Sequence, residues 1–178
     1  MIFDGRWKWE LQKLSWAISV WRRLPAFSSF AEHQLNRAIL YSATILRKVI
    51  EDEAEAETVA QEVELRMLKE NFRMPDFELL HATLSAIKFP HQKEQNETIR
   101  GKLYVSDYNN GQSVVLRVKN VCNWLIHSCV WSLAQTVAGS GYSGFLVSSD
   151  FDREKHIHFV SFSEWQRLIK LSIAHGAF

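Results

Sequence analysis

Hydrophobic residues near the start of the chain recur at the spacing of a helix. Apolar side chains three or four positions apart predict an amphipathic helix over residues 7–24, namely Trp7, Leu11, Leu14, Ile18 and Trp21. A second stripe follows Ser28 and Ser29, either of which can cap a helix N-terminus. This stripe comprises Ala31, Leu35, Ala38, Ser42, Ile45 and Val49. We expect the two helices to form an antiparallel pair across a short loop.

The acidic segment over residues 51–57 is expected to face solvent, and helical spacing resumes after it as far as Asn71. The pattern leaves open whether this last stretch is a separate third helix or the end of one long helix.

Beyond residue 72 the pattern predicts strands as well as helices. Residues 79–89 alternate in polarity and favour a strand, whereas the polar residues 90–98 indicate a loop. The apolar runs 103–105 and 114–116 flank Asn109-Asn110-Gly111, which predicts a β-hairpin because Asn-Gly suits a tight turn. Residues 145–147 and 156–160 predict a second hairpin across the charged turn 150–155. A last helix is expected from Ser163, which with Gln166 forms a capping box, and its predicted buried stripe is Trp165, Leu168, Ile169 and Ile173.

These elements predict a mainly α fold, in α+β terms a helical bundle core with one or two small β-hairpins. The length of 178 residues indicates a single domain over 1–178. Its helical N-terminal part would cover 1–72, and 73–178 would hold the hairpins, a buried helix and the C-terminal helix.

Composition narrows the classes of partner. A net charge of +1 lacks the basic excess of most nucleic-acid-binding domains, so DNA is not expected and RNA would need a local patch. No stretch approaches the length of a membrane span and no signal peptide is evident, so we expect no membrane association and a cytoplasmic location.

Two further patterns predict neither a cofactor nor a metal site. Gly139-Ser140-Gly141-Tyr142-Ser143-Gly144 matches G-x-G-x-x-G, but a helix precedes it and a strand follows, the reverse of the dinucleotide-binding order. We therefore expect a loop. His156 and His158 share one face of a strand, and without a third ligand at metal spacing they are expected to be a surface pair.

The segment with the most chemical content is the predicted helix over residues 119–131. It is apolar on nearly every side from Val121 onward and should be buried, yet Asn120, Asn123 and His127 form a polar stripe at i, i+3 and i+7. Buried polar groups need partners. The stripe therefore indicates either a hydrogen-bonded core network or a polar site in which a histidine exchanges a proton near neutral pH.

The same segment resembles a known family. Cys122-Asn123-Trp124-Leu125-Ile126-His127 is similar to the Arg-Asn-x-x-x-His signature of HEPN domains. The resemblance implies a small helical bundle, common in prokaryotic toxin–antitoxin and antiviral systems, that dimerises to form a composite ribonuclease site without a metal. It would make His127 the group that handles a proton during phosphodiester cleavage and Asn123 a positioning group. Cys122 occupies the place of the arginine, and Arg37, Arg47 or Arg117 would have to supply the guanidinium.

The resulting functional prediction is an HEPN-like, non-catalytic or divergent interaction or regulatory module of a prokaryotic defence or toxin–antitoxin type system. The alternative is a metal-independent ribonuclease that uses His127, so whether the protein is an enzyme stays open. The expected partners are a second copy of the chain, another protein, or RNA.

Overall fold

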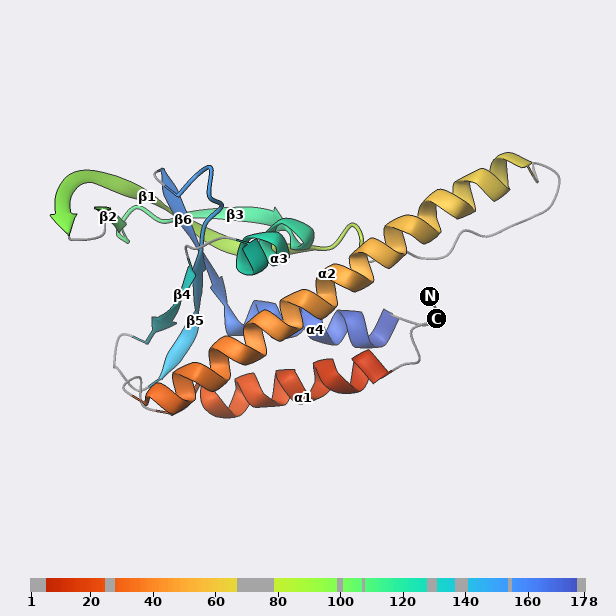
Figure 1. Cartoon of the computed structure of the whole chain (residues 1–178), viewed down its shortest axis with the longest axis horizontal. Helices are drawn as coiled ribbons and strands as arrows, with labels where there is room; N and C mark the ends of the chain where they lie inside the picture. The colour runs from red at the N-terminus through yellow and green to blue at the C-terminus, as the bar shows by residue number, and fades with distance from the viewer. Residues whose placement is uncertain are drawn as a thin grey trace.

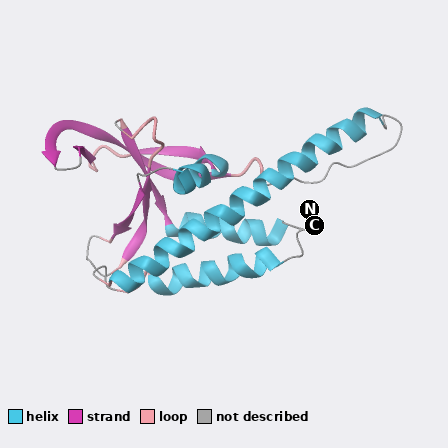
Figure 2. Cartoon of the chain, viewed as in Figure 1, coloured by secondary structure: helices cyan, strands magenta, loops and turns pink. Residues whose placement is uncertain are grey.

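The computed structural model describes residues 6–24, 28–66, 79–98, 101–106, 108–127, 131–136, 141–153 and 155–175. Within these residues the chain forms four helices and six strands (Figures 1 and 2). The helices are α1 (Arg6–Trp21), α2 (Ser29–Arg66), α3 (Val118–His127) and α4 (Phe162–His175). The strands are β1 (Thr83–Thr98), β2 (Gly101–Ser106), β3 (Gln112–Arg117), β4 (Trp131–Gln135), β5 (Tyr142–Val147) and β6 (His156–Ser161).

The N-terminal helices follow the predicted stripes. Leu11 and Ile18 of α1 are fully buried, and the backbone N–H of Ala31 donates to Oγ of Ser28, 3.2 Å away, so Ser28 caps α2. α2 then runs without a break through the acidic segment, so the single long helix is the correct alternative. This segment has no glycine or proline, and its alanine and glutamate residues favour helix.

The sequence predicted that the whole acidic segment faces solvent, and this prediction is wrong for one of its residues. Glu53 is only 4% exposed, and its Oε2 accepts a hydrogen bond of 2.6 Å from the backbone N–H of Leu80. This carboxylate ties α2 to the residues that lead into β1.

The strands form one sheet in which every pairing is antiparallel. The order β2–β1–β6–β5–β4 describes most of it, and β3 also pairs with β1. The first half of β1 pairs with β3 from Thr83↔Arg117 onward, and the second half pairs with β2 as far as Thr98↔Gly101. β2 and β3 therefore succeed each other along a single long strand.

The predicted hairpin between residues 103–105 and 114–116 is wrong, because both segments pair with β1. The Asn-Asn-Gly segment instead precedes β3, at a point where the chain passes close to β1. A Cβ at Gly111 would lie 2.6 Å from the ring of Phe89 and 2.7 Å from Ile87, so only glycine lets the chain pass this close to β1. The second predicted hairpin is present, since β5 pairs with β6.

The predicted helical bundle with one or two small hairpins is wrong, and the fold is α+β with an extended antiparallel sheet. Residues 90–98, expected as a loop, belong to β1, and Trp131, expected at the end of a helix, begins β4. Both are strands because neighbouring strands satisfy their backbone groups, which their own side-chain pattern does not reveal.

Helices α1, α2 and α4 lie side by side, and α4 contacts β1, β5 and β6 (Figure 1). Phe145 of β5 packs edge-on against Trp165 of α4, and the indole N–H of Trp165 donates to Oγ of Ser42 on α2 at 2.9 Å. The cap of α4 is Ser161 rather than Ser163, because Ser161 Oγ accepts the N–H of Glu164 at 3.2 Å. The predicted buried residues Trp165, Leu168 and Ile169 are fully buried.

The fourth helix, α3, is placed between two parts of the fold. It contacts α2 on one side and β3 and β5 on the other. This position brings the polar stripe of α3 next to the middle of α2. None of the helices in the described part of the chain is long and apolar enough to cross a membrane.

Candidate functional site

The helix that carries the predicted stripe is buried along one face only. Val118, Val121, Cys122 and Leu125 are buried, whereas Asn120 and His127 are exposed and Asn123 is partly buried. The expectation of a helix buried on nearly every side is therefore wrong. The polar stripe follows the open side of α3, where a solute can reach His127.

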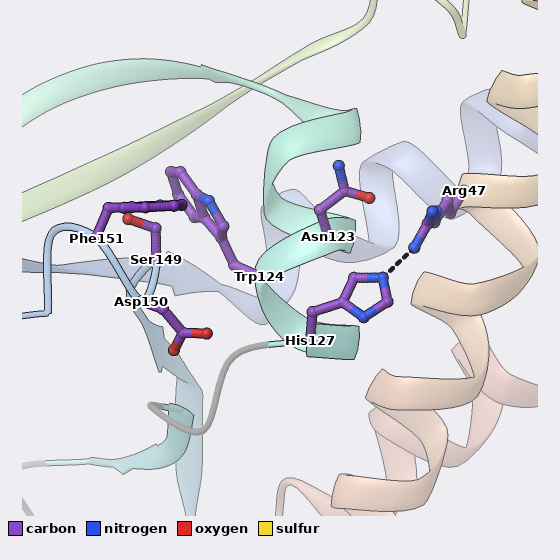
Figure 3. A pocket seen from close by; sticks show the side chains of 7 residues that line it. All are labelled: Arg47, Asn123, Trp124, His127, Ser149, Asp150 and Phe151. Carbon is purple, nitrogen blue, oxygen red and sulfur yellow. Dashed lines mark hydrogen bonds between the residues drawn. The ribbon is translucent and has the colours of Figure 1, made fainter.

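His127 contacts an arginine from a different helix. Nη1 of Arg47 on α2 lies at hydrogen-bonding distance from Nε2 of His127 (Figure 3). A guanidinium has donors and no acceptor, so Nε2 of His127 can take part in this hydrogen bond only as the acceptor. The contact therefore places a positive charge directly beside one nitrogen of the imidazole.

Arg47 is itself held in place. Its Nε donates to Oε1 of Glu51, one helical turn further along α2, at 2.9 Å. This pairing uses one edge of the guanidinium and orients the other toward His127. Of the three arginines that the sequence offered, Arg47 is the one beside His127, and Arg37 and Arg117 are exposed and do not line this pocket.

These side chains line an open pocket of about 250 Å³. Its walls are Arg47, Asn123, Trp124, His127, Ser149, Asp150 and Phe151. In Figure 3, Trp124 and Phe151 lie on one side, and His127 and Arg47 lie on the other. The pocket thus combines an aromatic wall with a polar wall. Asn120, the third member of the stripe, is not among the lining residues.

Asn123 bears on the choice between a structural network and a site. Its Oδ1 is buried and has no hydrogen-bond partner among the described residues. His127 bonds Arg47 rather than Asn123. A buried acceptor without a partner costs about 1–3 kcal/mol, so the stripe is not a self-satisfied core network. This arrangement favours the interpretation as a site.

The aromatic wall has a buried histidine behind it. The indole of Trp124 stacks on the imidazole of His158, with ring centroids 5.2 Å apart and planes 17° apart. Because His158 is only 5% exposed, the prediction of a surface histidine pair with His156 is wrong. Burial, together with the charges of His156 and Lys88, lowers the pKa of His158 to about 4. A neutral, rigid ring therefore supports Trp124.

The other aromatic residue, Phe151, lies on the turn 150–155 that the sequence predicted, although it was not among the predicted site residues. Ser149 Oγ donates to Oδ2 of Asp152 and accepts the backbone N–H of Asp152, both at 3.0 Å. The Ser149 hydroxyl, with smaller help from Lys155, holds the pKa of Asp152 below its ordinary value. Phe151, which lies between Ser149 and Asp152 in the chain, is 93% exposed and lines the pocket. An aromatic residue inside the charged segment 150–155 was the signal that could have identified it.

Cys122, at the motif position of the HEPN arginine, does not line the pocket. It is fully buried, and burial raises the pKa of its thiol to about 12, while the positive charge of Arg47 acts in the opposite direction. The guanidinium beside His127 therefore comes from α2, not from α3. Among the described residues, no three His, Cys, Asp or Glu side chains gather as a metal site would require.

Comparison with known proteins adds no relative. No protein-family model, curated protein or solved structure matches this chain. The resemblance to HEPN domains stays a prediction, and its implied helical bundle differs from the observed sheet-containing fold.

Proposed function

We propose that this pocket binds a phosphodiester of RNA and cleaves it without a metal, with His127 and Arg47 as the catalytic residues. The single observation that carries the proposal is the contact between the Arg47 guanidinium and Nε2 of His127 in an open pocket. A base and a fixed positive charge placed together are what attack on a phosphate requires. The guanidinium that the HEPN-like motif lacks is available from Arg47.

The proposed reaction is a transesterification within the RNA. The phosphate oxygens take the Arg47 N–H donors, which frees Nε2 of His127 to accept the proton of the adjacent 2′-hydroxyl. The 2′-oxygen forms a bond to phosphorus and the bond to the 5′-oxygen breaks, giving a 2′,3′-cyclic phosphate and a 5′-hydroxyl. Water supplies the proton of the leaving oxygen, and the imidazolium returns its proton to water.

Glu51 makes the arginine a directed donor. Its carboxylate holds one edge of the guanidinium, so the remaining N–H groups can accommodate developing charge on phosphate without a large rearrangement. Lysine could supply the charge but not this forked geometry.

The test uses purified protein, a fluorescently labelled single-stranded RNA and excess chelator. We expect wild type to release fragments with cyclic-phosphate ends, and His127→Ala and Arg47→Ala each to lower the rate by about 100-fold or more. Arg47→Lys should lie in between. His33→Ala changes an exposed α2 histidine outside the pocket and is the matched control. Equal cleavage by wild type and His127→Ala would show that the activity is not from this site.

The second candidate is the non-catalytic interaction or regulatory module of a prokaryotic defence or toxin–antitoxin type system, acting in the cytoplasm. The observation in its favour is on α1, where Trp9 is 63% exposed and Trp16 is 67% exposed. Seven positions apart, they share one helix face, and Lys13 between them lies over the Trp9 ring. Exposed tryptophans on one face are typical of protein contacts, here with a second copy of the chain.

Oligomeric state tests the second candidate without testing the first. The module should sediment as a dimer, and Trp9→Ala with Trp16→Ala should shift it toward monomer. A monomeric wild type at high concentration would argue against this homodimer, and it would leave the chemistry of the pocket unaffected.

A further inference from the structure

We infer that Trp124 and Phe151 form a base-stacking wall, so that the pocket takes one unpaired nucleotide of single-stranded RNA with its phosphate at Arg47 and His127. The inference rests on the proposed function and adds two residues that would determine substrate class. Trp124 stands at a variable position of the HEPN-like motif, and Phe151 lies outside it.

The argument starts from the exposure of Phe151. A phenylalanine that is 93% exposed gains nothing from the protein core, and it lines the same pocket as a guanidinium. Isolated exposed aromatics are ordinary on protein surfaces. Phe151 shares its pocket with a second aromatic ring and with a guanidinium. Proteins hold a base and its phosphate together by this combination of groups.

The ring of Trp124 and the backbone that carries Phe151 are held in place before any ligand arrives. Trp124 stacks on buried, neutral His158, and the turn around Phe151 is fixed by the Ser149–Asp152 hydrogen bonds and by a bond of 2.8 Å from the N–H of Lys155 to the carbonyl of Asp152. An ordered ring such as that of Trp124 loses little conformational freedom when a base stacks on it, and the fixed turn limits the positions that the ring of Phe151 can take.

The division of the pocket fits a nucleotide better than a free anion. The polar wall can accept a phosphate, whereas the aromatic wall offers planar apolar surface and, beside it, the carboxyl group of Asp150, which cannot bind a second anionic group. In a duplex the bases are already stacked and paired, so their faces are not available to an external ring. A single strand exposes them, and this geometry therefore selects single-stranded over double-stranded RNA.

The experiment measures binding separately from cleavage. The probe is a fluorescein-labelled single-stranded oligonucleotide with 2′-O-methyl riboses, which lacks the attacking hydroxyl and stays intact. A second probe has the same backbone with abasic units. Fluorescence anisotropy at fixed salt gives the affinity of each protein for each probe.

We expect Phe151→Ala to weaken binding of the base-bearing probe by about 5- to 100-fold, with little effect on the abasic probe. Phe151→Trp should keep the affinity for the base-bearing probe near that of wild type. Arg47→Ala should weaken both probes. Tyr108→Ala removes another exposed aromatic, outside the pocket, and is the matched control. Because Phe151 is almost wholly exposed, its truncation should leave the fold intact.

Three results would overturn the inference, and they are distinguishable. Unchanged affinity of Phe151→Ala, alongside His127-dependent cleavage, would leave the ribonuclease and remove the stacking wall. Equal losses for base-bearing and abasic probes would show that Phe151 acts on the backbone or on the turn. A wild type that binds neither probe and cleaves no RNA would remove the proposed function as well.

Discussion

The buried imidazole of His158 gives the fold a specific sensitivity to mild acid. The ring is 5% exposed, its Nδ1 has no hydrogen-bond partner in the described structure, and it lies between Trp124 and His156. Burial disfavours the imidazolium, and the charges of His156 and Lys88 disfavour it further, so its pKa falls from 6.5 to about 4. We expect His158 to account for most of the stability that the protein loses between neutral pH and about pH 4.

The sign and the size follow from the two pKa values. In the unfolded chain the imidazole binds a proton near pH 6.5, and in the folded chain only near pH 4. Between these values the unfolded state holds more protons, so the free energy of unfolding falls as pH falls and then levels below pH 4. At about 1.36 kcal/mol per pH unit the full loss is about 3.4 kcal/mol. Water in the neighbouring pocket would solvate part of the charge, so we expect about 2–3 kcal/mol.

Urea unfolding followed by far-ultraviolet circular dichroism, at pH values from about 7 to about 4, measures this loss. His158→Phe keeps a planar ring against Trp124 and removes the titrating group. Relative to its own value at neutral pH, it should retain about 2–3 kcal/mol more stability than wild type near pH 4. His33→Gln, on the exposed side of α2, should follow wild type.

Carboxylates also contribute to acid unfolding, and His158→Phe retains them. Asp152 also raises the pKa of His158, against the larger effect of burial. Asp152 and Glu164 have lowered pKa values, owing mainly to Ser149 and to Arg167 respectively, so their stabilisation is lost as pH falls through those lowered values in every variant alike. If the stability of His158→Phe declined in parallel with wild type between pH 6.5 and 4, the imidazole would have to be solvated or paired in the fold, and the reasoning would be refuted.

Two further substitutions test the core. Ser42→Ala removes the acceptor of the Trp165 indole N–H, where both side chains are fully buried. Urea unfolding should therefore show a loss of about 1–3 kcal/mol in the free energy of unfolding. When Trp165→Phe is added, the double variant should lose less stability than the sum of the two single variants. Cys122→Arg gives the motif the arginine of HEPN domains but places a charge at a fully buried position. We expect the free energy of unfolding to fall by at least about 3 kcal/mol, with no gain in RNA cleavage.

The helices could be predicted from the sequence because their information is local. Leu11 and Ile18 repeat at helical spacing, and that repeat is the face that α1 buries. The course of β1 is different. Its pairings join Ile87 to Phe159 on one side and Leu84 to Leu116 on the other, and no pattern within residues 83–98 specifies such distant neighbours.

The candidate site divides in the same way. Asn123 and His127 could be found from their spacing on one helix, and both line the pocket. Arg47 was one of three candidate arginines, and only the packing of α2 against α3 distinguishes it. Phe151 had one local signal, an aromatic residue in a charged turn, but its place in a pocket depends on how that turn packs in the fold. Asn120 shows the opposite error, since it shares the stripe but not the pocket.

The partners of β1 also determine when its strand pairings can form while the chain is being synthesised. Ile87 pairs with Phe159, so one side of the central strand has no neighbour until β6 leaves the ribosome. At about 5–20 residues per second, β1 waits several seconds with that side open. An unpaired strand edge can add a strand from another chain. The yield of native protein should therefore depend on translation speed and on the crowding of nascent chains as well as on the stability of the finished fold.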